Sequence, residues 1–188
     1  CYTPVYVGHC DDPAGRRIQA FTVLSRSHSK NALGPEAQRE AAAEKLVDAG
    51  HAKPAVERHA TFYLKAGSAW AKGVDTHGGL ERLHRLAQEL EDLSAILERE
   101  AGQDPPTLDS AIRSLLAVLA LDPVTSELGT QAAHLEWLDA ALVASEKVET
   151  PGALAAEALL ARGRARRALG RCEEALEDFQ RGQALAAR

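Results

Sequence analysis

Two runs near the carboxyl end of the chain decide the expected fold. They read ALAAEALLARGRARRAL at residues 153–169 and CEEALEDFQRGQALAA at residues 172–187. Alanine, leucine, glutamate and arginine, which are strong helix formers, make up most of both runs. Gly170 stands between them, and a residue without a side chain lets the chain reverse there. The two runs therefore predict an antiparallel helical hairpin.

The same hairpin resembles the tetratricopeptide repeat (TPR), most clearly over residues 156–185. The matching positions are Leu159, Gly163, Gly170, Ala175 and Phe179. The resemblance implies that Gly163 and Ala175 are small because the two helices cross closely there. It implies that Phe179 fills the groove between one repeat and its neighbour. It also implies a concave surface, lined by the first helix of each hairpin, that holds peptide segments.

Several residues depart from the family's pattern. Gly182 replaces the usual alanine, and no proline closes the repeat. Arg162 stands where the family prefers leucine, and Arg166 stands where it prefers an aromatic residue. Because the family packs both of these positions against neighbouring helices, the two arginines predict a terminal repeat with an exposed face.

Weaker matches upstream predict two to three irregular helical hairpins over residues 107–188. The pairs Leu128-Gly129 and Ala141-Leu142 precede Arg162-Gly163 and Ala175-Leu176 by 34 residues, the period of the repeat. The stretch that ends at Asp122-Pro123 resembles a second helix and its closing turn, in a register that differs by a few residues. The sequence leaves both registers open.

Helical patterns also cover residues 35–104. Helices are expected from Glu36 to Ala49 and from Pro54 to about Gly73. The clearest is a single helix over residues 80–100, in which leucines recur every three or four positions from Leu83 to Leu97. This leucine stripe favours a bundle helix, and a short coiled-coil seam is the competing interpretation.

Prolines and polar residues divide the next part of the chain. Thr107 or Asp109 is expected to cap a helix over residues 108–121, and Asp122-Pro123 is expected to stop it. Another helix is expected over residues 127–147. Its inward face would carry Ala132, Leu135, Leu138 and Leu142.

The first 34 residues differ from the rest. β-branched and aromatic residues at 5–7 and 18–24 flank the turn signal DDPAG at residues 11–15, which predicts a small extended or β arm. The expected fold is all-α or mainly α, with antiparallel hairpins in a short α-solenoid or bundle. The expected parts are residues 1–34, residues 35–104 and residues 107–188.

Composition excludes several classes of function. Hydrophobic residues make up 45% of the chain, which is enough for a core, but aromatic residues make up only 4%. The net charge of -5 argues against nucleic-acid binding through phosphate contacts. No apolar run is long enough for a membrane span.

The three cysteines form no disulfide framework, so a reducing, cytoplasmic location is expected, with a Cys1–Cys10 bridge as the open alternative. The missing methionine and the start at Cys1 suggest a fragment of a larger protein.

Reactive residue types gather only at His9-Cys10-Asp11-Asp12. A cysteine nucleophile needs a base placed in space, and adjacency along the chain does not supply that geometry. A polar turn is therefore the favoured interpretation of this cluster. The seven histidines form no metal-binding motif, and no glycine-rich phosphate loop or dinucleotide fingerprint is present, so neither a metal nor a cofactor is expected.

The densest group of basic residues lies in the second half of the first helix of the hairpin and just after it. Arg164, Arg167 and Arg171 lie on one side of a helix, three and four positions apart. In the tetratricopeptide family, Arg164 and Arg167 would face the groove and could bind acidic side chains or a terminal carboxylate. A solvated face balanced by nearby glutamates is the competing interpretation.

Three functions are therefore open. The favoured one is a protein-interaction or scaffold module that binds a protein or peptide segment, of acidic character, in a helical-repeat groove. The second is an enzyme that uses the amino-terminal Cys10 and His9. The third is a dimerising helical regulator that uses the stripe from Leu83 to Leu97.

Overall fold

The computed structural model of this chain describes residues 50–187, Asp48 and four short strands near the amino end. The chain divides into two compact units, residues 1–62 and residues 63–188. The helical second unit carries the candidate site.

The four strands have two residues each. They are β1 (Val5–Tyr6), β2 (Cys10–Asp11), β3 (Arg17–Ile18) and β4 (Phe21–Thr22). β1 pairs with β4 and β2 pairs with β3, both antiparallel. The pairing of β1 with β4 joins the two β-rich runs that the sequence indicated for the arm. The helix expected from Glu36 to Ala49 lies outside the described residues except for Asp48.

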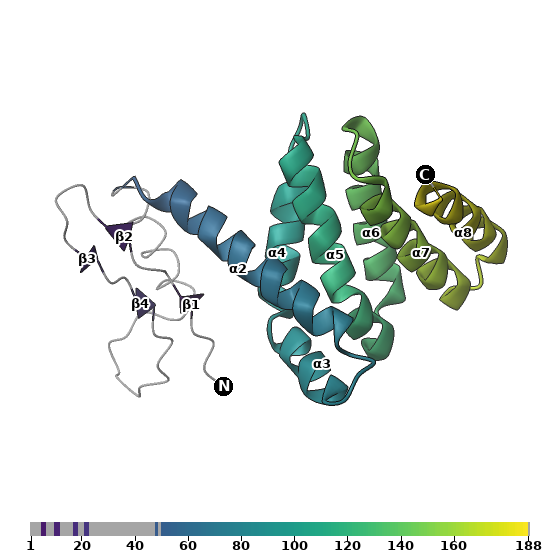
Figure 1. The fold of residues 1–188 in the computed structure, drawn as a ribbon, viewed down its shortest axis with the longest axis horizontal. Coiled ribbons are helices and arrows are strands. Elements are labelled where there is room, and N and C mark those ends of the chain that lie inside the picture. The colour runs from purple at the N-terminus through teal and green to yellow at the C-terminus, as the bar shows by residue number, and fades with distance from the viewer. Residues whose placement is uncertain are drawn as a thin grey trace. The chain divides into compact units, whose positions relative to one another are not determined.

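Helices dominate the rest of the described residues, so the expectation of a mainly α fold is confirmed. They are α2 (Ala52–Lys72), α3 (Gly79–Gln88), α4 (Leu90–Ala101), α5 (Leu108–Leu128), α6 (Gln131–Lys147), α7 (Gly152–Ala168) and α8 (Cys172–Ala186). From α4 to α8, each helix packs against the next along the chain (Figure 1). α5 also contacts α7, and α4 also contacts α6, so the helices form two layers.

The helix expected over residues 80–100 is two helices. α3 ends and α4 begins at Glu89, whose φ of -100° and ψ of 14° depart from helical geometry. No glycine or proline stands there, so the sequence carries no local signal for the break. Leu86, Leu93 and Leu97 from the stripe are almost completely buried, as a bundle helix requires.

α5 continues past the expected stop at Asp122-Pro123. Proline has no N–H to donate to the carbonyl group of Leu119, so one helical hydrogen bond is missing. The helix persists because its next residues, Val124 and Thr125, are buried in the core. It ends at Gly129, which has a φ of 73°. α6 consequently starts at Gln131 and not at Glu127, and Ala132 is exposed whereas Leu135, Leu138 and Leu142 are buried.

The start of α5 was indicated correctly by the sequence. The Thr107 hydroxyl accepts a hydrogen bond from the backbone N–H of Ser110 at 3.1 Å. The backbone N–H of Thr107 donates to the Ser110 hydroxyl at 2.9 Å. This reciprocal pair satisfies two donors at the helix start, and Thr107 is the cap.

α7 and α8 form the hairpin that the carboxyl-terminal runs predict, within one residue at each end. Gly170 has a φ of 79°, which suits glycine at the reversal. A Cβ atom at Gly163 would lie 2.4 Å from Cε1 of Phe179, so the glycine allows the ring to lie across α7. Phe179 therefore packs within its own hairpin, where the family pattern would place it against a neighbouring repeat.

The 34-residue spacing does not relate equivalent positions. Gly163 lies inside α7, whereas Gly129 follows the end of α5. α5 and α6 have 21 and 17 residues, whereas α7 and α8 have 17 and 15. The hairpin of α5 and α6 is therefore longer than the hairpin of α7 and α8.

Arg162 and Arg166 do not form an exposed face. Only 9% of the surface of Arg162 is exposed, and its Nε and Nη2 atoms donate to the two carboxylate oxygens of Asp178 at 2.9 and 2.6 Å. Its Nη1 atom donates to Asp139 at 2.9 Å. Arg166 donates to Asp178 at 2.8 Å. These four residues, named the ionic cluster below, join α6, α7 and α8.

The charges of the ionic cluster are balanced, with two arginines and two aspartates. Asp178 is only 1% exposed, so its charge depends on these partners. Burial lowers the pKa of Arg162, but hydrogen bonds and the charge of Asp178 raise the pKa by more. The departures from the family pattern therefore replace apolar contacts between helices with buried ion pairs.

Candidate functional site

Three helices of the second unit each turn one face toward an open cavity of about 540 Å³. We name this cavity the groove. Its lining comprises Ser68, Ala71, Lys72 and Asp75 from α2 and the following turn, Leu116, Leu119, Ala120, Asp122 and Pro123 from α5, and Pro151, Ala153, Leu154, Glu157, Leu160 and Arg164 at α7. The α7 positions from 153 to 164 recur every three or four residues, as one face of a helix does.

The centre of the groove is apolar. Leu116, Leu119 and Leu154 are half-buried, and Leu160 is 36% exposed. Most leucines on the inner faces of the helices are covered by other helices, whereas these keep part of their surface open to the groove. Covering that surface with another molecule would release water from it and stabilise the complex.

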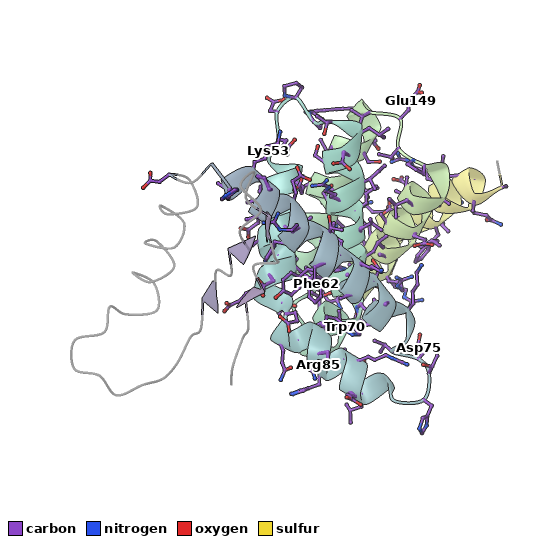
Figure 2. All side chains as sticks on the ribbon, turned by 60° about the vertical axis from the view of Figure 1, so that its left-hand side comes forward. Lys53, Phe62, Trp70, Asp75, Arg85 and Glu149 are labelled. Atoms are coloured by element: carbon purple, nitrogen blue, oxygen red, sulfur yellow. The ribbon has the colours of Figure 1, made fainter. Side chains whose placement is uncertain are left out.

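The end of the groove at α2 is formed in part by the turn that follows this helix. Arg82 of α3 donates from Nη1 to the carbonyl oxygen of Gly73 at 2.7 Å and to the hydroxyl of Thr76 at 2.5 Å. These bonds fix the turn on which Asp75 lies (Figure 2). Asp75 itself is exposed.

A series of polar side-chain contacts leads from the groove into the core. Arg164 of α7 donates from Nη2 to Oδ2 of Asp122 on α5 at 2.7 Å. The other oxygen of Asp122 lies 3.1 Å from Nε2 of His134 on α6. The His134 side chain is fully buried, and its Nδ1 atom has no hydrogen-bond partner among the described residues.

The pKa of Asp122 reflects these contacts. Burial alone would raise the pKa, because it disfavours the charged carboxylate. The hydrogen bond from His134 and the positive charge of Arg164 lower the pKa by more, so the net shift is downward. The carboxylate of Asp122 is therefore the stable form beside the groove at neutral pH.

The three arginines of the predicted site have different surroundings. Arg164 lines the groove. Arg167 is exposed and makes no ion pair within the described part of the chain. Arg171 is exposed beyond the end of α7 and donates from Nε to Glu174 at 2.6 Å. Neither Arg167 nor Arg171 lines the groove.

Sequence reasoning missed most of the groove. The sequence indicates Asp122 as part of a helix stop, and it assigns the glutamates near the arginines, of which Glu157 is one, to a solvated face. Lys72 is the last residue of α2 and Asp75 lies in the turn after it, and neither belongs to a sequence motif. Helical spacing on α7 could have linked Ala153 and Glu157 to Arg164, but the contribution of α2 depends on tertiary packing.

A second group of polar residues surrounds the break between α3 and α4. Burial raises the pKa of Tyr63 well above its ordinary value, and the charges of Asp92 and Glu89 raise it further. Burial and the charge of Asp92 also raise the pKa of Glu89, against the opposing charge of Arg85. None of these residues lines the groove.

The structure does not support the other sites that the sequence left open. His9 lies outside the described residues, whereas Cys10 lies in β2 opposite Ile18. Within the described ranges, no three histidine, cysteine or acidic residues gather as metal ligands would. None of the helices described here has the length and apolar character needed to cross a membrane. The central leucines of the stripe, Leu86, Leu93 and Leu97, are buried within the chain and do not form an exposed dimer seam.

No protein-family model, curated protein or solved structure matches the chain.

Proposed function

We propose that this chain is a protein-interaction module that binds a segment of a partner protein in the groove between α2, α5 and α7. The observation that carries the proposal is the groove itself, in which half-buried leucines are bordered by charged side chains. Ligand sites in proteins commonly combine an apolar lining with a few polar groups that fix orientation.

The arrangement of the helices supports the proposal. α5 and α7 are the first helices of two successive hairpins, and both line the groove. The tetratricopeptide resemblance implies the same division, in which first helices face the ligand and second helices lie behind them. The ionic cluster ties α6, α7 and α8 together, so the α7 wall of the groove is rigidly held.

Selection from a library of random displayed peptides of about twelve residues tests the proposal. The bait is the whole chain, compared with Ala153→Trp and Ala140→Trp. Both alanines are exposed on helices, but only Ala153 lines the groove. A tryptophan at 153 fills part of the cavity, whereas one at 140 on α6 leaves it open.

We expect peptides that bind the parent chain and Ala140→Trp but not Ala153→Trp. Equal far-ultraviolet circular dichroism and equal urea midpoints for the three proteins show that the fold is unchanged. Peptides that bind all three proteins alike would assign binding to another surface and overturn the proposal. A selection that yields no binder overturns it as well.

A further inference from the structure

The groove has more carboxylates than cationic groups, and part of each is already used in an ion pair within the chain. Two cations, Lys72 and Arg164, face three carboxylates, on Asp75, Asp122 and Glu157. Arg164 and Asp122 neutralise each other, at 2.7 Å. The second oxygen of Asp122 is occupied by His134. One ammonium group and two carboxylates therefore remain for a ligand.

Those remaining carboxylates are accessible. Asp75 and Glu157 are both exposed, and neither forms an ion pair within the described part of the chain. They come from different walls, Asp75 from the turn after α2 and Glu157 from α7. Ionised carboxylates only accept hydrogen bonds, so a ligand has to supply the donors.

The backbone beside the groove lacks one helical donor. Pro123 cannot donate to the carbonyl group of Leu119, and both residues line the groove. A carbonyl group that lacks its helical partner gains from a donor on a ligand. The groove is thus rich in acceptors, and its only guanidinium group is already bound to Asp122.

We infer that the groove selects a partner segment in which a large apolar side chain stands close to a lysine or arginine; this rests on the proposed function. The apolar side chain covers the leucines of α5 and α7, and the cation binds Glu157 or Asp75. Arginine suits both carboxylates, because its planar guanidinium group can donate two parallel hydrogen bonds to one carboxylate.

An acidic segment fits the same surface poorly. It would meet two unpaired carboxylates against the single ammonium group of Lys72, and to bind Arg164 it would have to compete with Asp122. Removing Arg164 would leave the charge of Asp122, whose side chain is 17% exposed, without its cationic partner. The internal pairing of Arg164 therefore reverses the charge preference that the arginines alone suggest.

The peptides selected against the parent chain give the first readout. We expect lysine and arginine to be enriched beside an aromatic or aliphatic residue in those peptides that Ala153→Trp no longer binds. One selected peptide is then synthesised with a fluorophore, together with a copy in which each lysine or arginine is replaced by glutamate. We expect the charge-reversed copy to bind at least tenfold more weakly in fluorescence anisotropy.

The second readout uses variants of the chain. Asp75→Asn combined with Glu157→Gln should weaken binding of the basic peptide by about tenfold and reduce its salt dependence, as expected for two partly exposed ion pairs. The matched control is Glu173→Gln combined with Glu177→Gln, two exposed acids on α8 outside the groove. The control should bind like the parent chain.

The outcomes separate this inference from the function on which it rests. Peptides that need an open groove but are enriched in aspartate or glutamate, or show no charge preference, overturn the inference and leave the proposed function standing. If the double variant Asp75→Asn with Glu157→Gln binds the basic peptide as tightly as the parent chain does, the inference is likewise overturned and the proposed function stands. Peptides that bind Ala153→Trp as tightly as the parent chain overturn both the inference and the proposed function.

Discussion

Arg162 and Arg164 lie two residues apart on α7, yet one is part of the core and the other lines the groove. Arg162 lies between α6 and α8 and binds Asp139 and Asp178. Arg164 is half-exposed and binds Asp122 on α5. Two residues correspond to about 200° around a helix, so the two side chains leave α7 on opposite sides.

The difference between them is one of solvation. Arg162 and Asp178 have little access to water, so removing Arg162 leaves the buried carboxylate of Asp178 with Arg166 as its remaining cationic partner. The pair of Arg164 and Asp122 borders an open cavity, where water can replace a lost partner. The first arginine therefore holds helices together, and the second shapes the charge of a binding surface.

The largest effect is expected from Arg162→Met. Methionine keeps most of the apolar stem but leaves the buried carboxylate of Asp178 with fewer partners, and we expect a loss of about 3–5 kcal/mol in the free energy of unfolding. Urea denaturation followed by circular dichroism measures it. The double variant Arg162→Met with Asp178→Leu should recover part of the loss, because the buried carboxylate is then absent and Arg166 still lies 3.7 Å from Glu174.

The matched control is Arg167→Met, on the same helix but exposed and without an ion pair among the described residues. Its free energy of unfolding should change by less than about 0.5 kcal/mol. If Arg162→Met were as mild as this control, the cluster would not hold the helices together, and the contrast between Arg162 and Arg164 would fail.

Asp122→Asn is expected to cost less. The carboxylate accepts hydrogen bonds from Arg164 and His134, and bonds to a charged group contribute about 1.5–3 kcal/mol. Because the pKa of Asp122 is lowered in the folded state, its contribution is present above the ordinary aspartate pKa. The contribution disappears as the pH falls through the lowered value.

Urea denaturation of both proteins at neutral pH and at several acidic values measures this difference. We expect the two stability curves to converge at the lowest pH. Asp109→Asn is the control, because Asp109 is exposed and pairs with Arg113 of the same helix, an arrangement worth a few tenths of a kcal/mol. Curves that stay parallel for Asp122→Asn would contradict the lowered pKa.

The sequence predicted features whose signals are local. The α7–α8 hairpin follows from helix-forming residues on either side of Gly170, and its ends are correct within one residue. The Thr107 cap likewise depends on residues three positions apart. The resemblance assigns Arg164 to the inner face of its helix, and Arg164 lines the groove, but its role in binding a partner stays a prediction.

Features that depend on distant partners could not be predicted. Arg162 is buried because Asp178 and Asp139, 16 and 23 residues away, reach it from other helices. α5 passes through Pro123 because burial of Val124 and Thr125 outweighs one missing hydrogen bond. Tetratricopeptide identity stays a prediction, since only the last hairpin carries the matching residues.

Gly163 lies between the two arginines in the sequence, and Gly163→Ala tests the contact between α7 and α8 at this position. The added Cβ atom would lie 2.4 Å from Phe179 and force the ring or α8 to move, which costs about 1–3 kcal/mol. Alanine offsets up to about 1 kcal/mol of this through its higher helix propensity. We therefore expect a net loss of about 1 kcal/mol in the free energy of unfolding.

Phe179→Leu combined with Gly163→Ala should relieve the clash and lose less than the sum of the two single losses. The comparison variant is Gly152→Ala, whose Cβ atom would meet only the carbonyl oxygen of Leu185, at 3.7 Å. That change should be neutral or slightly stabilising. A stabilising Gly163→Ala would show that α7 and α8 are not in close contact at this glycine.

The smallest effect is expected from Arg171→Gln, which completes the comparison along α7. Arg171 binds Glu174 three residues away, and hydrogen bonding to Glu174 raises the pKa of Arg171. Both side chains are exposed, however, so water solvates each charge when the other is removed. We expect no measurable change in the urea midpoint, at low or high salt, and no change in the affinity for a groove-binding peptide. A loss comparable to that of Asp122→Asn would mean that exposure does not separate the structural arginines from the solvated ones.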